Sequence, residues 1–405
     1  IGQLLGLFGL APLRLYGLRG VVLAHVCLNL PLATRLILQG WQEVPAERFR
    51  LAAQLGFDAP AMFRLIEWPL LRQVIPGALA VVFAICLTSF AVALTLGGGP
   101  KATTIELGIY QAFRFEFDLG RAALLSGLQI LLATGAAMVA IRLAQGTGFG
   151  TGLDRSLRRW DGRTTLARTT DTVWIALAAA FLLLPLGAIV ASGVPGFAGL
   201  PFVVWKAAGV SLLVATASTL LLLLAALPMS AAIATGRHTA IELAGLLGLA
   251  ASPLVIGTGL FILIRPIADP FLLALPVTAL VNALMSLPFA MRILVPRARD
   301  IVERYGKLGL SLNMGHGPFL WRVFLPRMRA QIGFAAGLGM ALSIGDLGVI
   351  TLFADPDIAT LPLQIYRLMG SYQMEAAAGG ALLLLLLSVG TFWLLDRGGR
   401  YHAEI

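Results

Sequence analysis

The chain has 405 residues, of which 58% are hydrophobic and 12% charged, whereas soluble globular proteins are about 45–50% apolar and about 25% charged. A soluble core cannot hide that much apolar surface, so the composition excludes a soluble globular protein and indicates a polytopic membrane protein. The formal net charge of +10 is compatible with nucleic acid or with membrane headgroups, and the position of the charges decides between them.

Nine apolar stretches follow one another along the chain. Each has about the length, roughly 20 residues, that an α-helix needs to cross a bilayer. The sequence therefore predicts an all-α polytopic membrane protein with about nine transmembrane helices. The predicted spans are Leu18–Leu38, Val74–Leu96, Leu119–Leu143, Val173–Ala191, Ala207–Leu227, Ile241–Ile264, Phe271–Leu294, Gln331–Leu352 and Ala376–Leu395.

Basic residues are concentrated in alternate loops between these spans. One set of loops holds 21 of the 30 Lys and Arg residues, and the opposite set holds seven. Because short cytoplasmic loops carry the excess of basic residues, we expect the first set, and with it the C-terminus, to be cytoplasmic. This distribution follows the topology rule and argues against a nucleic-acid partner. The basic loops are 40–72, 142–171, 228–240, 292–329 and 397–405.

Several landmarks occur twice, in the same order and at nearly the same spacing of 256 or 257 residues. Both copies stand at equivalent places relative to the predicted spans, so they predict tandem repeats that run parallel through the membrane. The landmarks are the Leu-Pro-x-Ala-x-Arg motifs at 30–35 and 287–292, Pro69 and Pro326, and the Ile-Tyr pairs at 109–110 and 365–366.

These repeats divide the chain into three parts. Residues 1–143 contain three spans and correspond to the C-terminal half of a first repeat. Residues 144–171 form a cytoplasmic linker, and residues 172–405 contain the six spans of a second repeat. The first repeat is then truncated at its N-terminus, and we expect an odd number of spans before residue 1 in the natural protein.

The basic loop of the first repeat is predicted to contain a short amphipathic helix. Pro45 suits the first turn of a helix, and Gly56 suits the left-handed residue that follows a helix end. Between them, Phe49, Ala52 and Ala53 lie on one helical face. The small residues Ala52 and Ala53 would allow close approach of a partner.

The second repeat has a related pattern, with a helix predicted near residues 300–312 and Asn313 at the left-handed position. One such helix could lie on lipid headgroups. Two copies at equivalent places favour docking to a partner that itself has two equivalent halves.

Both loops resemble the cytoplasmic signature of ATP-binding-cassette importer permeases. In that signature a Gly is followed, after nine residues, by an apolar residue, any residue, an apolar residue and Pro. The matching residues are Gly56 with Ile66-Glu67-Trp68-Pro69, and Asn313 with Val323-Phe324-Leu325-Pro326. The Glu-Ala-Ala that opens the signature is replaced here by Arg50-Leu51-Ala52 and by Lys307-Leu308-Gly309.

Nearly the whole chain is similar to the fused permeases of thiamine importers. The most specific tract runs from Leu96 to Leu107 as Leu-Gly-Gly-Gly-Pro-Lys-Ala-Thr-Thr-Ile-Glu-Leu. Shorter similar tracts lie at 54–56, 66–69, 110–111, 360–362 and 370–372. The fused ferric-iron permeases share the general plan, so iron or another small solute stays open as the substrate.

The resemblance implies a pore-forming subunit of a type I importer, which moves thiamine or its phosphates across the bacterial inner membrane by alternating access. Its implied partners are a cytoplasmic ATPase dimer, which hydrolyses the ATP, and a periplasmic substrate-binding protein. It implies no bound cofactor. The implied ATPase-docking residues are Phe49, Ala52, Ala53, Gly56, Lys307, Leu308 and Asn313.

Two other classes of membrane protein are alternatives, an integral membrane enzyme and a standalone ion-coupled carrier. An integral membrane enzyme would need a catalytic constellation, and the sequence shows no nucleophile elbow, paired catalytic carboxylates or metal-ligand spacing. A standalone ion-coupled carrier favours inverted repeats and paired intramembrane charges, whereas these repeats are parallel.

Asp346 is the clearest acid within a predicted span, and acids in membranes are rare and often functional. It either contributes to the transport pathway or has a structural role, as a helix cap or as the partner of an Arg. The candidate pathway residues are Ser89, Asn282, Ser343 and Asp346.

Overall fold

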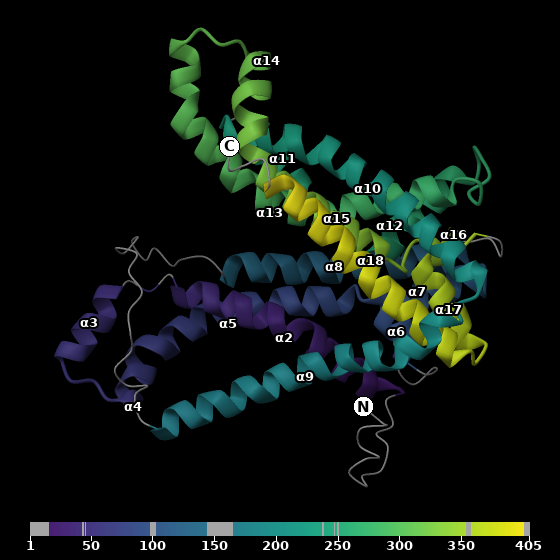
Figure 1. The fold of residues 1–405 in the computed structure, drawn as a ribbon, viewed down its shortest axis with the longest axis horizontal. Helices are drawn as coiled ribbons and strands as arrows, with labels where there is room; N and C mark the ends of the chain where they lie inside the picture. The colour runs from purple at the N-terminus through teal and green to yellow at the C-terminus, as the bar shows by residue number, and fades with distance from the viewer. Residues whose placement is uncertain are drawn as a thin grey trace. The chain divides into compact units, whose positions relative to one another are not determined.

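The computed structural model describes residues 16–42, 44, 46–97, 103–143, 165–236, 239–246, 248, 251–353 and 358–400. Throughout these ranges the regular secondary structure is helical (Figure 1), which confirms the prediction of an all-α protein. Within them, seven helices are long and apolar enough to cross a membrane. They are α2 (Leu18–Gln42), the continuous run α4–η1–α5 (Ala59–Leu87), α8 (Leu119–Leu143), α9 (Thr165–Ala198), α10 (Phe202–Ala234), α13 (Ala274–Ser311) and α18 (Met374–Arg400).

Shorter helices connect or flank these spans, and two of the segments are π-helices, η1 and η5. They are α3 (Ala46–Gln54), α4 (Ala59–Met62), η1 (Phe63–Glu67), α5 (Trp68–Leu87), α6 (Phe90–Leu96), α7 (Ile105–Arg114), α11 (Thr239–Leu246), α12 (Pro253–Ile264), α14 (His316–Phe319), η5 (Leu320–Phe324), α15 (Leu325–Ile344), α16 (Ile350–Phe353) and α17 (Leu361–Gly370).

Three of the nine predicted spans are interrupted in the structure. The prediction missed these breaks because an average of hydropathy does not register a local break in a helix. The span at 74–96 is divided between α5 and α6, the span at 241–264 between α11 and α12, and the span at 331–352 between α15 and α16. At the start of α12, Ser252 Oγ accepts a hydrogen bond from Val255 N at 3.1 Å. This N-cap begins a new helix inside the apolar stretch.

The element boundaries follow the spacing of the predicted repeat. The segments α4, η1 and α5 begin at residues 59, 63 and 68, and α14, η5 and α15 begin at residues 316, 320 and 325. All three pairs differ by 257, and so do the ends of α5 and α15. The helices α7 and α17 are related by 256 in the same way.

The chain folds as two compact units whose boundaries differ from those of the repeats. Unit 1 comprises residues 1–104 and 128–188, and unit 2 comprises residues 105–127 and 189–405. Helix α7, from the first repeat, packs in unit 2 against α12 and α16. The predicted linker lies outside the described residues from 144 to 164, and α9 begins at Thr165.

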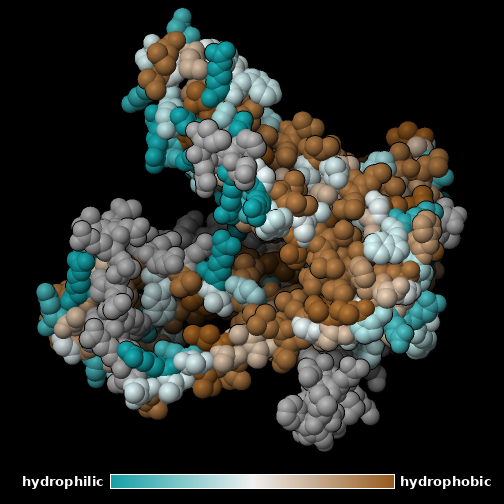
Figure 2. All heavy atoms as spheres, viewed as in Figure 1, coloured by the Kyte–Doolittle hydropathy of each residue, from teal (hydrophilic) through white to brown (hydrophobic). Residues whose placement is uncertain are grey.

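The core of unit 2 is built from α10, α13, α15 and α18, which pack extensively in pairs. Glycines set the close approach of α15 and α18, since a Cβ at Gly333 would lie 2.6 Å from the carbonyl oxygen of Leu395. A Cβ at Gly337 would lie 2.9 Å from the carbonyl oxygen of Phe392. Figure 2 shows hydrophilic side chains gathered on the hairpin of α13 and α14, and hydrophobic ones over much of the bundle.

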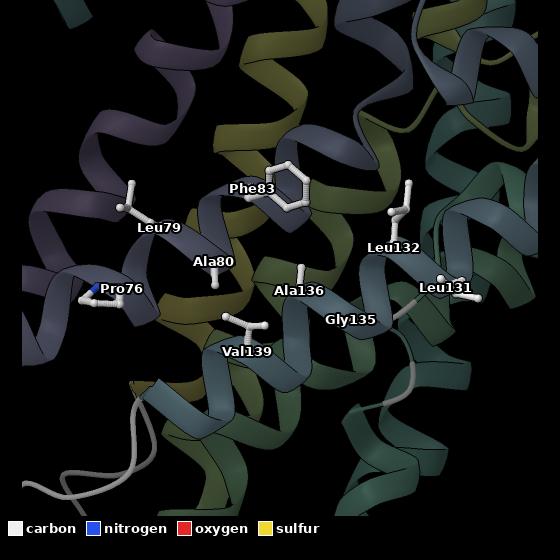
Figure 3. A pocket seen from close by; sticks show the side chains of 9 residues that line it. All are labelled: Pro76, Leu79, Ala80, Phe83, Leu131, Leu132, Gly135, Ala136 and Val139. Carbon is white, nitrogen blue, oxygen red and sulfur yellow. The ribbon is translucent and has the colours of Figure 1, made fainter.

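In unit 1 the helices equivalent to α15 and α18, which are α5 and α8, line an open groove of about 590 Å³ (Figure 3). Pro76 and Ala80 stand there at the positions of Gly333 and Gly337, 257 residues earlier. The groove is lined by apolar residues without a charged or hydrogen-bonding side chain, so it is not a site for a polar ligand. Its lining is Pro76, Leu79, Ala80, Phe83, Leu131, Leu132, Gly135, Ala136 and Val139.

Candidate functional site

The first-repeat loop is organised around the end of α3. Phe57 N donates to Ala52 O at 3.0 Å and Gly56 N donates to Ala53 O at 3.2 Å, the two hydrogen bonds of a Schellman motif. Gly56 has φ +68°, as the sequence predicted. The motif turns the chain sharply, so that α4 returns toward α3.

The predicted docking residues of this loop fall into two groups. Phe49 and Ala52 are buried in a cluster with Val44, Met62 and Leu70, so they fix α3 to the rest of the loop. Ala53 and Gly56 are exposed and remain free to contact a partner. Two leucines beside them, Leu51 and Leu55, are 56% and 63% exposed.

The second-repeat loop differs from the prediction in one respect. Instead of a separate helix near 300–312, α13 continues without a break from Ala274 to Ser311. The predicted terminus is correct, because Asn313 follows it with φ +50°. Asn313 N donates to Leu310 O at 3.0 Å and Met314 N to Gly309 O at 2.9 Å, so the same Schellman motif closes both helices.

Lys307, Leu308 and Asn313 are all exposed in this loop. Leu308 is 53% exposed and Leu312 is 64% exposed. These two leucines stand 257 residues after Leu51 and Leu55. Each loop therefore presents a pair of exposed leucines at equivalent positions.

In each loop a small residue at the helix end packs with a larger partner, and the loop with the smaller helix residue has the larger partner. In the first repeat Ala52 and the fully buried Met62 belong to one cluster. At the equivalent positions the second repeat has Gly309 and Phe319, and a Cβ at Gly309 would lie 2.9 Å from Phe319 Cδ2. A smaller residue on the helix thus accommodates a larger one opposite.

Two of the four candidate pathway residues meet in unit 2. Asn282 on α13 donates its Nδ2–H to Ser343 Oγ, near the end of α15, at 2.9 Å. The two residues are only 4% and 6% exposed. Buried polar groups need such partners, so this hydrogen bond joins α13 to α15 beside the break that follows Ile344.

Asp346 lies within that break, in the turn between α15 and α16. Its Oδ1 accepts a hydrogen bond from Gly348 N at 3.2 Å. Its Oδ2 is buried and has no hydrogen-bond partner among the described residues. One carboxylate oxygen therefore shapes the turn, while the other is buried without a hydrogen bond from the described residues.

Ser89 occupies the corresponding break in unit 1. The helix before each break ends at equivalent positions, Leu87 and Ile344, and Ser89 stands 257 residues before Asp346. Ser89 precedes α6 with an extended backbone, and its side chain makes no cap hydrogen bond to that helix. The same chain break thus carries a hydroxyl in one repeat and a carboxylate in the other.

Sequence reasoning missed the residues that position each loop. Met62 and Phe319 read as ordinary apolar residues, and the two π-helices have different sequences. The offset of 257 would have paired Ala52–Met62 with Gly309–Phe319, but only the coordinates show that each pair is in contact. In the specific tract at 96–107, residues 98–102 lie outside the described part, whereas Glu106 is fully buried in α7.

No family model matches the chain. It is 39% identical over 393 residues to the thiamine transport system permease protein ThiP of Escherichia coli (strain K12), a match that covers 94% of this chain and 73% of that protein. It is 38% identical over 400 residues to the protein of the same name from Salmonella typhimurium, covering 96% and 74%. The ThiP protein of Haemophilus influenzae is 33% identical over 399 residues, covering 96% and 74%.

Proposed function

The chain belongs to the family of thiamine transport system permeases, and we propose that it forms the membrane pathway of an ATP-driven thiamine importer. The family and the multi-pass helical fold support transport as its activity. The observation that carries the finer proposal is the duplicated loop, which offers two equivalently built docking surfaces on one chain.

Each docking surface is formed by the exposed side of a helix end and its Schellman turn. In the first repeat it comprises Leu51, Ala53, Leu55 and Gly56, while Phe49 and Ala52 hold the helix in place from beneath. In the second repeat it comprises Lys307, Leu308, Leu312 and Asn313. Exposed leucines at each helix end suit an apolar groove on a partner.

A cytoplasmic ATPase dimer is the proposed partner of these surfaces. Both lie in loops that carry the excess of basic residues and are therefore assigned to the cytoplasm, together with the C-terminus. A dimer of identical subunits presents two equal grooves, and two equivalent loops on one chain match that symmetry. ATP hydrolysis belongs to that partner, and an extracytoplasmic binding protein delivers the substrate.

The proposed pathway follows the polar residues at the helix breaks. Thiamine is a cation, and the free Oδ2 of Asp346 offers a negative partner for it in a region of low dielectric. The hydrogen bond between Asn282 and Ser343 fixes the helix that leads to this turn, and Ser89 supplies a neutral polar group in the first repeat. Alternating access would result from movement of the two repeats, driven by the ATPase.

The test of this proposal is association and coupling in a purified complex. The chain is co-expressed with the ATPase subunit, and ATP hydrolysis is measured with and without thiamine-loaded binding protein. We expect a stable complex whose hydrolysis is stimulated by the loaded binding protein. Replacement of Leu51 and Leu308 together by Glu should release the ATPase. A complex that forms equally well with both replacements would contradict the docking assignment.

A further inference from the structure

The two π-helices η1 and η5 occupy equivalent places, immediately after each docking loop. Trp68 N donates to Phe63 O, and Leu325 N donates to Leu320 O, so each bond spans five residues instead of the four of an α-helix. The two segments, FRLIE and LWRVF, have no identical residue at equivalent positions, and they share only the apolar character of their first and fourth residues. No specific side chain within the segments is therefore common to both.

The feature that the two segments share is the proline two residues after each of them, Pro69 and Pro326. In an α-helix the ring of a proline collides with the carbonyl group four residues earlier. That group belongs to Leu65 in the first repeat and to Arg322 in the second. A π turn at this point inserts one extra residue and moves that carbonyl away from the ring. Pro76 in α5 and Pro288 in α13 are accommodated without a π turn, so the ring favours the π turn at this place but does not by itself produce one.

The extra residue changes which side chains face α3, the helix that carries the docking surface in the first repeat. Met62 and Leu70 are eight residues apart, and in an unbroken α-helix they would point about 80° apart. With one residue absorbed in the π turn the difference falls to about 20°. Both residues are indeed buried in the same cluster with Phe49 and Ala52.

The second repeat shows the same alignment. Phe319 lies against Gly309, and the guanidinium carbon of Arg327 lies 4.1 Å from the centre of the Tyr305 ring. Phe319 and Arg327 are again eight residues apart, and their partners are separated by one turn of α13. Across both π turns, residues on either side thus face the same helix end.

We propose that Pro69 and Pro326 are positioning residues: through the π turn, each sets the orientation of its docking loop relative to the helix that follows. This inference rests on the proposed function for its consequence, which is coupling to the ATPase. Without the π turn, and with the chain length unchanged, the loop would rotate by about 100° around the axis of α5 or α15. Its leucines would then miss the partner.

The test combines a substitution with a deletion. Pro69→Ala removes the ring that favours the π turn, and we expect the loop to rotate and ATP-dependent thiamine uptake to fall several-fold. Deletion of the exposed Leu65 from the Pro69→Ala variant should restore uptake, because a continuous α-helix that is one residue shorter keeps the original faces. Deletion of Leu65 alone should also impair uptake, since Pro69 would then lie inside an α-helix.

The rate of methionine oxidation reports the orientation of the loop without a transport assay. Met62 is fully buried, so peroxide should oxidise it several-fold faster in Pro69→Ala and at the original rate after the deletion. Met328, which is also fully buried, should stay protected throughout. Pro76→Ala is the matched control, because Pro76 lies inside α5 without a π turn and its replacement should change neither readout.

The second repeat provides an independent pair of variants, Pro326→Ala with and without deletion of the exposed Arg322. This pair tests the proposal if a first-repeat variant does not reach the membrane. Unchanged uptake and a protected Met62 in Pro69→Ala would overturn the proposal. So would a failure of the deletions to restore uptake in both repeats. If the unmodified chain bound no ATPase and imported no thiamine, the proposed function would fail, whereas the oxidation pattern of Met62 would still report on the π turn.

Discussion

Gly309→Ala tests whether the size exchange between the two loops is a packing requirement. The added Cβ would lie 2.9 Å from Cδ2 and 3.2 Å from Cε2 of Phe319, whereas carbon atoms in contact are about 3.5–4.0 Å apart. Overpacking of this kind costs about 1–3 kcal/mol. Replacing Gly by Ala in a helix returns up to about 1 kcal/mol. The expected net loss is therefore about 1 kcal/mol.

Phe319→Met in the same chain should remove the conflict, because it recreates the Ala–Met pair of the first repeat. The double variant should be more stable than the sum of the two single changes by about 1–2 kcal/mol, as expected for residues in contact. The reciprocal pair, Ala52→Gly with Met62→Phe, provides the matched control and should show coupling of the same sign.

Amide hydrogen exchange measures the stability of the Schellman turn at the end of α13 locally. Met314 N donates to Gly309 O at 2.9 Å, so its exchange rate reports on opening of the Schellman turn. A loss of about 1.4 kcal/mol corresponds to tenfold faster exchange. We expect faster exchange in Gly309→Ala and recovery in the double variant. Effects that simply add in both loops would refute the reasoning, since they would mean that the paired residues do not constrain each other.

Three further predictions follow from the same geometry. Gly56→Ala should weaken the first loop by about 1 kcal/mol, because an L residue at φ +68° is strained, whereas Asn313→Ala should cost less because a Cβ is already present there; equal losses of ATPase association would contradict this asymmetry. Asp346→Asn should insert and assemble normally, because the amide oxygen can still accept from Gly348 N, yet import thiamine poorly; wild-type uptake in vesicles with a matched protein level would remove the pathway role. Ser343→Ala should leave Asn282 Nδ2 with only the longer hydrogen bond of 3.5 Å to the Ser343 carbonyl oxygen and lower stability by about 1–3 kcal/mol, and Asn282→Leu in the same chain should recover much of that loss in a thermal unfolding assay.

The two left-handed helix ends were the local features that the sequence predicted best. Gly56 and Asn313 both adopt the left-handed conformation expected of them, because that preference is local and depends on the residue itself. The membrane spans were predicted from mean hydropathy, which locates apolar stretches but not breaks within them. Thr88-Ser89 and Gly345-Asp346 therefore interrupt helices that had been predicted as continuous.

The candidate site was predicted less completely, since it depends on contacts between distant residues. Phe49, Ala52 and Ala53 share one helical face in the sequence, yet the structure buries the first two and exposes the third. The partner that divides them is Met62, which returns to α3 only through the turn at Gly56. Asn282 and Ser343 are separated by 61 residues, and their hydrogen bond depends on how α13 and α15 pack.

Uptake of labelled thiamine by sealed vesicles tests the central claim most directly. The vesicles carry this chain with its ATPase subunit, ATP is enclosed on the side of the basic loops, and the binding protein is added outside. We predict uptake that requires both ATP and the binding protein, that is not driven by an ion gradient, and that excess ferric iron does not reduce. Uptake that continues without ATP under an ion gradient, or accumulation of iron in place of thiamine, would contradict the account.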